Sequence, residues 1–353
     1  MDYKRELDDL LSTVFKEQAS DLHLSEGRHP VIRVAGLLSP LVKKSVLTKE
    51  DTTGFLKVML DGEDMQIFLK NKEMDFSYSH GGVGRFRVNA YFQRGSVGIA
   101  FRWIPKTIKT LDELNLPPAL EIFTRKQQGF FLVVGPVGHG KTTTIAAMIE
   151  VINQERAEHI ITIEDPIEYV FEDKKAIIDQ REVRQDTKSF QNALLSIFRQ
   201  DVDVVLIGEM RGIETIATAV TAAETGHLVF STLHTNNAAQ TLNRIIDSFP
   251  PAQQDQIRIQ LASSLAGIFS QRLIPRISGG LIPAYELLIN NSAVANLIRE
   301  RRTHEINTVI ETGMEQGMID MNRSLADLVR AGEITIENAY AHSLNTRILE
   351  RMI

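Results

Sequence analysis

The most constraining feature of the sequence is the octapeptide Gly-Pro-Val-Gly-His-Gly-Lys-Thr at residues 135–142. It matches the phosphate-loop pattern G-x-x-x-x-G-K-[ST] at every fixed position. An apolar run at 130–134 indicates a buried strand before it, and apolar residues recur at helical spacing over 145–152. Glycines let the backbone close around phosphate oxygens, and the amides that begin a helix point towards an anion. The alternative is a chance match in a glycine-rich turn, but such a match would not explain the strand before the loop and the helix after it. The pattern therefore predicts a nucleoside triphosphate site.

Length and composition place this loop in a globular protein of two domains. The chain has 353 residues, of which 43% are hydrophobic and 24% are charged. It contains no cysteine, which excludes disulfides and thiolate metal sites. No apolar stretch has the length of a membrane span, and residues 1–6 lack the apolar core of a signal peptide. We therefore expect a cytoplasmic protein that reaches a membrane only through a partner. A net charge of −6 argues against sequence-independent nucleic-acid binding.

The pattern along the chain predicts an α/β protein. Helices are expected at 3–17, 48–60 and 63–70, strands at 22–24 and 31–34, and a turn at 35–36. Apolar strands alternate with amphipathic segments over 120–247, which predicts a mainly parallel sheet with crossover helices. Beyond residue 250 the chain is expected to be mostly helical. A polar connector at about 104–118 separates a first domain, 1–107, from a second, 108–353.

A hairpin in the first domain is predicted from two alternating segments. Apolar residues occupy even positions over 85–93 and odd positions over 97–103. Matching the apolar faces pairs residues 92, 90, 88 and 86 with 97, 99, 101 and 103, and leaves a two-residue turn at 94–95. This register places Arg87 opposite Arg102, with Arg85 beside them. Like charges in register are unfavourable unless an anion relieves them. The face is therefore either a solvated one or a set of arginines that reach a nucleotide.

Acidic residues follow two predicted strands of the second domain. Glu164 and Asp165 follow the strand at 159–163, and Glu209 follows the strand at 201–207. Ligands of open parallel sheets lie beyond the carboxyl ends of the strands, so these side chains are expected to face the phosphates. Hydrolysis of ATP needs a carboxylate for the attacking water and another for Mg²⁺. Because glycine fills the usual Asp position before Glu209, Glu209 would serve the metal and Glu164 would be the base. The alternative is that these acids are plain turn or cap residues.

Histidines occur at two places near this edge. His234 follows a third strand, 228–233, where it would contact a γ-phosphate or the hydrolytic water, unless it is a structural histidine. His139 lies inside the phosphate loop, and we expect only its backbone to matter. Lys141 would reach the β- and γ-phosphates, and Thr142 would ligate Mg²⁺.

Together these motifs resemble the secretion-type ATPases, and most closely the PilT/PilU family of type IV pilus retraction ATPases. Four motifs stand in the family's order: the phosphate loop, Ile-Glu-Asp-Pro-Ile-Glu at 163–168, Gly-Glu-Met-Arg at 208–211 and Ser-Thr-Leu-His-Thr at 231–235. The resemblance extends to 19–24 and 85–89 in the first domain and to 293–300 near the C-terminus. It implies a PAS-like α+β first domain and a RecA-like second domain with a helical C-terminal part.

The resemblance also implies roles for individual residues. Glu164 would be the catalytic base, Glu209 would lie near the metal with Thr142, and His234 would sense the γ-phosphate. Arg85, Arg87 and Arg102 match arginine-rich positions that reach a nucleotide, without showing which of them acts. The residues expected to bind ATP are Gly135, Pro136, Val137, Gly138, His139, Gly140, Lys141, Thr142 and Thr143.

The resemblance implies a homo-hexameric motor, driven by ATP and Mg²⁺, in which the first domain rotates against the second to retract a pilus during twitching motility. It would dock on an inner-membrane platform protein, with a paralogous pilus ATPase as a further partner and no nucleic acid. The loop departs from the family's usual residues at 137–139, and Ala295 replaces an arginine of the 293–300 motif. Two alternatives stay open: an accessory PilU-like ATPase, and a RecA-like motor that translocates nucleic acid. The absence of cysteine separates the chain from extension motors, which commonly carry a four-cysteine zinc site.

The segment 293–302 is the predicted docking surface for the pilus machinery. It carries Arg299, Arg301 and Arg302, although the same pattern also fits a solvated helix end. Replacement of Leu297 and Ile298 with alanine is expected to abolish retraction and to spare ATPase activity if the segment docks, and to abolish both if the segment is structural.

Overall fold

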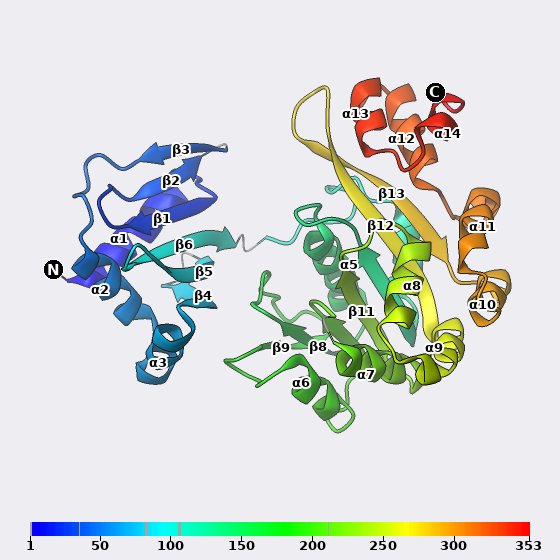
Figure 1. Ribbon diagram of the computed structural model, residues 1–353, viewed down its shortest axis with the longest axis horizontal. Coiled ribbons are helices and arrows are strands. Elements are labelled where there is room, and N and C mark those ends of the chain that lie inside the picture. The colour runs from blue at the N-terminus through cyan, green and yellow to red at the C-terminus, as the bar shows by residue number, and fades with distance from the viewer. Residues whose placement is uncertain (1, 35, 82–83, 105–106, 211) are drawn as a thin grey trace. The chain divides into compact units, whose positions relative to one another are not determined.

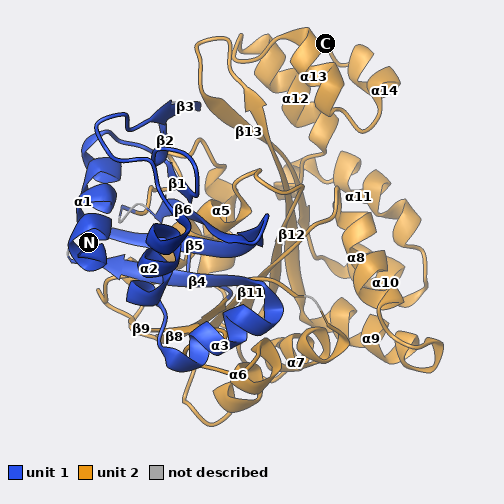
Figure 2. Cartoon of the chain, turned by 60° about the vertical axis from the view of Figure 1, so that its left-hand side comes forward, with its two compact units in different colours: residues 1–107, 165–170 blue, residues 108–164, 171–353 orange. Residues whose placement is uncertain are grey.

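The computed structural model describes residues 2–34, 36–81, 84–104, 107–210 and 212–353. The chain separates into two compact units, which Figure 2 shows in different colours. Unit 1 comprises Met1–Thr107 and Asp165–Val170, and unit 2 comprises Ile108–Glu164 and Phe171–Ile353. Segment Asp165–Val170 groups with unit 1, whereas the sequence predicts that it belongs to the second domain, 108–353.

Unit 1 is built on a six-stranded antiparallel sheet with the order β3-β2-β1-β6-β5-β4. Its elements, in chain order, are α1 Tyr3–Lys16, β1 Asp21–Ser25, β2 Val31–Val34, β3 Leu37–Pro40, α2 Lys49–Met59, α3 Gly62–Asn71, β4 Glu73–His80, β5 Gly84–Gln93 and β6 Ser96–Ile104 (Figure 1). The predicted first three helices are confirmed. Of the turn predicted at 35–36, Gly36 has a positive φ of 83°, and residue 35 lies outside the described residues.

Helical spacing and capping explain why the helices of unit 1 begin and pack as they do. The buried residues of α1 are Leu7, Leu10, Leu11 and Val14, which form one face at helical spacing. Asp2 caps α1 by accepting a hydrogen bond from the Arg5 amide. Thr48 and Asp51 form a capping box at the start of α2. These apolar faces cover the sheet and join its core.

The hairpin of β5 and β6 has the predicted register. Phe92 pairs with Val97, and Arg87 lies opposite Arg102. Arg94 and Gly95 form the turn with positive φ values of 49° and 81°, which suit a two-residue hairpin turn that follows the strand twist. Buried side chains alternate along β5 as expected, whereas the first four residues of β6, 96–99, are all buried.

Unit 2 contains a seven-stranded sheet with the order β13-β12-β7-β11-β10-β8-β9. Its strands are β7 Gly129–Val134, β8 His159–Glu164, β9 Ile177–Glu182, β10 Val204–Ile207, β11 Leu228–Leu233, β12 Leu265–Pro275 and β13 Leu281–Ile289. Its α-helices are α4 Glu121–Thr124, α5 Lys141–Glu155, α6 Phe190–Ile197, α7 Ile213–Glu224, α8 Ala238–Asp247, α9 Pro251–Ser264, α10 Ser292–Arg299, α11 Ile306–Thr312, α12 Met321–Arg330, α13 Ile336–His342 and α14 Thr346–Glu350. Three 3₁₀ turns accompany them at Pro118–Leu120, Thr303–Glu305 and Met314–Gln316.

All strand pairs of this sheet are parallel except β12 with β13, which confirms the predicted mainly parallel sheet. Strands β7, β10 and β11 are buried along their whole length, as expected of strands covered on both faces. The long hairpin of β12 and β13 was not predicted, because the region beyond residue 250 was expected to be mostly helical (Figure 1).

The outer part of this hairpin carries the C-terminal helices. Ile274 and Ile282 pack with residues of α12, α13 and α14 in a separate small core. Helices therefore do dominate the C-terminal region, but they depend on two strands for their apolar support. Among the residues that the structure describes, no helix combines the length and apolar character needed to cross a membrane.

Candidate nucleotide site

The phosphate loop connects β7 to α5 and depends on its glycines. Gly135, Gly138 and Gly140 have φ values of 148°, 79° and 78°, a region that L-residues with side chains rarely adopt. At Gly135 a Cβ atom would lie 2.3 Å from the backbone oxygen of Gln271. Gly140 occupies the N-cap position, so α5 begins at Lys141 and its first amides point into the loop. The loop geometry thus depends on the two glycines that the motif prescribes, Gly135 and Gly140, and on a third, Gly138, at a free position of the motif.

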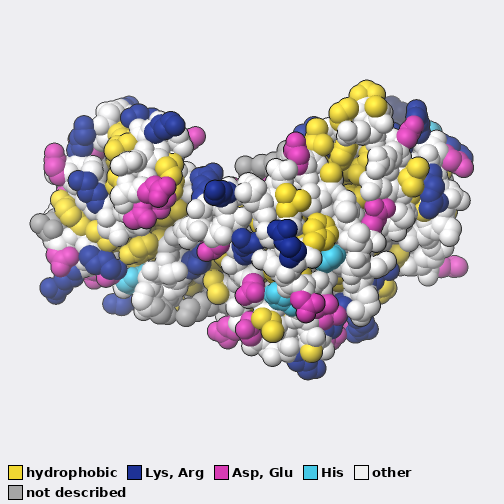
Figure 3. All heavy atoms as spheres, turned by 90° about the horizontal axis from the view of Figure 1, so that it is seen from below, with side chains coloured by type: hydrophobic (Ala, Val, Ile, Leu, Met, Phe, Trp, Pro, Cys, Tyr) yellow, Lys and Arg dark blue, Asp and Glu magenta, His cyan; other side chains and the backbone are white. Residues whose placement is uncertain are grey.

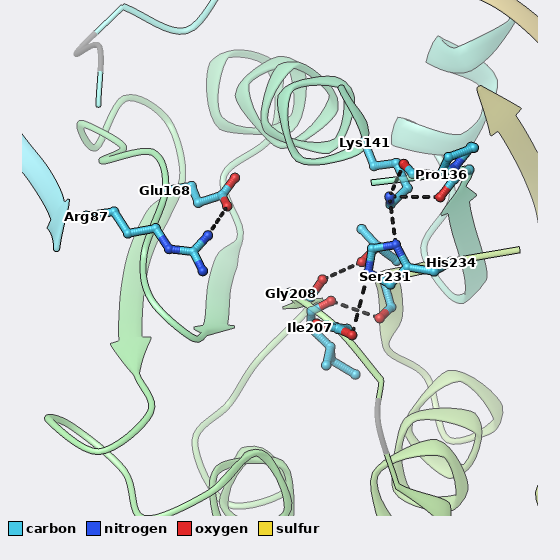
Figure 4. Close-up of polar contacts among 11 residues, drawn as sticks. Arg87, Pro136, Lys141, Glu168, Ile207, Gly208, Ser231 and His234 are labelled. Atoms are coloured by element: carbon cyan, nitrogen blue, oxygen red, sulfur yellow. Dashed lines mark hydrogen bonds and ion pairs between the residues drawn. The ribbon is translucent and has the colours of Figure 1, made fainter. Parts of the chain in front are cut away.

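The Lys141 side chain lies folded into this loop and is 7% exposed. Its Nζ donates hydrogen bonds to the carbonyl oxygens of Gly135 and Pro136 at 2.9 and 2.8 Å. It also lies 3.1 Å from Nδ1 of His234 (Figure 4). Lysine can only donate, so Nδ1 of His234 must be the acceptor.

His234 therefore connects the phosphate loop to the acidic residue after β10. Because Nδ1 accepts from Lys141, the proton of the neutral ring sits on Nε2. That nitrogen lies 3.6 Å from Oε1 of Glu209. The structure thus brings together three predicted residues: Lys141 at the start of α5, His234 after β11 and Glu209 after β10.

Hydroxyl groups of β11 fix the position of the chain after β10. Ser231 Oγ donates to the Ile207 carbonyl oxygen at 2.8 Å, and Thr232 Oγ1 donates to that of Gly208 at 2.6 Å (Figure 4). A Cβ atom at Gly208 would lie 3.3 Å from the Ile163 carbonyl oxygen. This tight approach to the end of β8 favours glycine at the position where a Walker-B strand usually carries aspartate.

Glu164 is the last residue of β8 and is only 5% exposed. Its Oε1 accepts hydrogen bonds from Thr162 Oγ1 at 2.7 Å and from Gln180 Nε2 at 3.3 Å. The sequence analysis did not single out Thr162 or Gln180, since a hydroxyl two residues earlier and an amide on the next strand form no motif. Both donors orient this buried carboxylate.

Strand β12 supports the phosphate loop from a distant part of the sequence. Gln271 is 3% exposed, and its Nε2 donates to the His139 carbonyl oxygen at 3.0 Å. Its Oε1 accepts from Thr144 Oγ1 at 2.6 Å. The His139 ring also has a partner here, because its Nδ1 accepts from the Leu273 amide at 2.9 Å. The expectation that the His139 side chain is incidental was therefore wrong.

A buried carboxyl group on β13 holds the start of α8, directly after the His234 segment. Glu286 is 5% exposed, and its Oε1 accepts from the Ala238 amide at 2.7 Å and from Ser270 Oγ at 3.3 Å. Burial raises the pKa of Glu286 to about 7, although the hydrogen bonds from Ala238 and Ser270 oppose this shift. In the sequence, the only signal for Glu286 is that it is a lone acid within an apolar run.

The three arginines expected to reach a nucleotide lie in unit 1 and have protein partners there. Arg85 donates to Ser77 Oγ, Arg87 Nη1 lies 3.4 Å from Glu168 Oε1, and Arg102 Nε lies 3.0 Å from Asp21 Oδ1. Acidic side chains of the same unit thus relieve the like-charge pair of Arg87 and Arg102. Their contact with a nucleotide stays a prediction.

The donor chemistry near the loop fits Mg²⁺. Magnesium in phosphate-binding sites usually keeps several waters and takes one or two protein oxygen ligands besides the phosphates. Thr142, at the start of α5, and Glu209 supply a hydroxyl and a carboxylate of this kind. Within the described part of the chain, no group of three or more His, Cys, Asp or Glu side chains is arranged to hold a metal alone.

The segment 293–302 differs from its predicted role in one respect. Leu297 and Ile298 are 9% and 0% exposed and belong to the main core of unit 2, so they are not surface residues. The arginines are exposed, and Arg301 Nη2 bonds Asp255 at 2.7 Å while Arg302 pairs with Glu300 and Glu305. Substitution of the two apolar residues is thus a test of folding rather than of docking.

The sheet of unit 2 is mainly parallel, with a phosphate loop after β7, acids after β8 and β10, and a histidine after β11. This arrangement defines a RecA-like phosphate-loop ATPase. The sequence profile of the Type II/IV secretion system protein family matches residues 3–310. The chain belongs to this family.

Individual relatives are similar over nearly the whole chain. The type IV pilus retraction ATPase PilT of Pseudomonas aeruginosa is 44% identical over 336 residues, which cover 95% of this chain and 97% of PilT. The type IV pilus ATPase PilU of the same organism is 40% identical, over 99% of this chain and 91% of PilU. A crystal structure of the pilus retraction motor PilT with bound ADP superposes with a TM-score of 0.91, at 45% identity and 98% coverage of both chains. The chain is accordingly an ATPase of this family.

Proposed function

We propose that the chain is an ATP-hydrolysing motor that retracts a type IV pilus and so drives twitching motility. The observation that carries this proposal is the convergence of Lys141, His234 and Glu209 at the end of the parallel sheet, in a chain so similar to a pilus retraction ATPase. The proposed location is the cytoplasmic side of the inner membrane, where a pilus platform protein would hold the motor.

In the proposed mechanism, the phosphate loop and Lys141 bind the triphosphate. Lys141 Nζ, which now donates to the carbonyl oxygens of Gly135 and Pro136 and to His234 Nδ1, would donate to phosphate oxygens instead. Thr142 and Glu209 would hold Mg²⁺, which neutralises charge on the phosphates during transfer. Glu164 would accept a proton from the attacking water as the bond between the β- and γ-phosphates breaks, giving ADP and phosphate.

His234 is proposed to report the state of the site to α8. When Lys141 turns towards the phosphates, its hydrogen bond to Nδ1 of His234 would be replaced by one from a donor on the substrate side, such as the hydrolytic water. The turn after His234 leads directly into α8, whose first amide is held by Glu286. A movement of His234 would therefore displace the start of this helix.

The assembly proposed for this activity is a homo-hexameric ring in which the first domain rotates against the second about the connector at 104–118. Arg85, Arg87 and Arg102 are proposed to reach a nucleotide once the ring forms, exchanging their present carboxylate and hydroxyl partners for phosphate.

This proposal is tested by the ATPase rate per chain as a function of protein concentration, with the mass of the particle measured in parallel. Activity that rises steeply and then reaches a plateau as six-chain particles form supports the ring motor. Activity that is independent of concentration, from single chains, contradicts it.

A second candidate, an accessory retraction ATPase, is favoured by the 40% identity to PilU. It predicts that the chain alone hydrolyses ATP poorly at every concentration and is stimulated by a paralogous ATPase. The nucleic-acid alternative finds less support, since basic side chains lie among acidic and apolar ones on the face in Figure 3.

A further inference from the structure

Strand β12 extends beyond the end of its neighbour β7, and the phosphate loop takes the place of the missing strand. The last residue pair between the two strands is Ser270 with Val134. Past this point the backbone groups of β12 that face β7 have no strand to bond. The Gln271 carbonyl oxygen instead lies against Gly135, and the Leu273 amide donates to the His139 ring. The loop therefore supplies a hydrogen-bond acceptor to a backbone amide at this edge of β12.

The Gln271 side chain ties the loop to the helix that follows it. Its amide nitrogen holds the backbone of His139, inside the loop, and its amide oxygen holds the hydroxyl group of Thr144, in the first turn of α5. Gln271 and Thr144 are 3% and 1% exposed, so water does not compete for these bonds. A neutral amide with one donor and one acceptor in use suits this position better than an acid or a base.

We propose that His139 and Gln271 are positioning residues that clamp the phosphate loop against β12 in its nucleotide-binding conformation. This inference rests on the proposed role of the loop in binding phosphate. Glycine-rich segments lose more conformational freedom than others when they are ordered, and contacts made before the ligand arrives remove that cost from binding.

The His139 ring acts through a single atom, which permits a matched pair of variants. Asparagine places an oxygen acceptor near the position of Nδ1, whereas leucine fills similar space with no acceptor. We expect His139→Leu to weaken binding of ADP about tenfold, and His139→Asn to keep it within about twofold, measured by isothermal titration calorimetry on the full chain. Equal effects of both variants, or no effect of either, would overturn the role of His139.

Gln271 is tested by Gln271→Met, which keeps the length of the side chain and removes both hydrogen-bonding groups. Gln154→Met, an exposed residue on the same α5 helix, is the matched control and should bind ADP as the wild type does. Weaker ADP binding by Gln271→Met alone, about fivefold or more, supports the clamp. Unchanged binding refutes it.

Two further variants keep the test decisive. If His139→Leu or Gln271→Met does not fold, as judged by thermal unfolding, Thr144→Val removes only the hydroxyl donor to Gln271, and unchanged ADP binding by that variant overturns the proposal. Lys141→Ala separates the two levels of the argument: if it binds ADP as well as the wild type, the proposed phosphate site itself is wrong. If Lys141→Ala loses binding and the clamp variants do not, only the clamp is wrong.

Discussion

Replacement of Glu286 with glutamine is expected to change how the free energy of unfolding of unit 2 depends on pH. Burial raises the pKa of this carboxyl from 4.5 to about 7 in the folded chain. Between these values the unfolded chain releases the proton and the folded chain retains it. The wild-type protein therefore loses stability as the pH rises from 4.5 to about 7, and the full penalty remains above that range.

The size of the effect follows from the same two pKa values. A gap of about 2.5 pH units corresponds to about 3 kcal/mol of destabilisation at alkaline pH. Glutamine retains an acceptor for the Ala238 amide and the Ser270 hydroxyl and carries no charge. We therefore expect the stability of Glu286→Gln relative to wild type to increase by about 2–3 kcal/mol between about pH 5 and about pH 8.

The assay is unfolding in urea followed by far-ultraviolet circular dichroism, because Trp103, the single tryptophan, lies in unit 1 and would not report on unit 2. Glu311→Gln on the exposed surface of α11 makes the same chemical change and serves as the control. A difference between Glu286→Gln and wild type that is the same at both pH values would refute the reasoning.

Two further predictions concern the core and the loop. Ile298→Ala is expected to lower the free energy of unfolding by about 2–5 kcal/mol, because the Ile298 side chain is fully buried. Arg299→Ala, at an exposed position of the same helix, should change it by less than about 0.5 kcal/mol. Urea unfolding measures both variants, and similar effects would contradict the assignment of Ile298 to the core. Gly135→Ala is expected to abolish ADP binding, because the added Cβ atom would lie 2.3 Å from the Gln271 carbonyl oxygen and residue 135 has a φ of 148°. Binding is measured by calorimetry, and wild-type affinity would show that the loop tolerates another conformation.

Local patterns in the sequence predicted the elements that depend on local rules. The hairpin of unit 1 followed from alternation, because shifting the register by one residue would expose every apolar side chain. The positions of Glu164, Glu209 and His234 followed from strand ends, since the carboxyl ends of parallel strands share one edge of the sheet, and that of Lys141 followed from the phosphate-loop motif.

The strands and side chains that hold the phosphate loop in place could not be predicted from local patterns. Strands β12 and β13 are buried on both faces over most of their length, so their apolar runs do not alternate and cannot be distinguished from a buried helix. The one local signal for this hairpin is the turn sequence Ser278-Gly279-Gly280 between the two strands. Gln271 and Thr144 are separated by 127 residues, and no periodicity reports a contact at that distance.

The partners of the unit 1 arginines show a related limit. The alternation of apolar residues predicted Arg87 opposite Arg102, but it did not predict that Glu168 and Asp21 would form ion pairs with them. Those acids come from other strands and from segment Asp165–Val170, whose grouping with unit 1 depends on the folded chain. Tertiary contacts thus decided the electrostatics of a face that local alternation had defined correctly.

The most direct test of the central claim is the effect of Glu164→Gln on hydrolysis and on binding, measured separately. Glutamine preserves the acceptor for Thr162 and Gln180 but cannot take a proton from water. The account predicts that the rate of phosphate release falls by about 10²–10⁴-fold while the affinity for ADP stays within about twofold of the wild type. Phosphate release at close to the wild-type rate would contradict the assignment of Glu164 as the base.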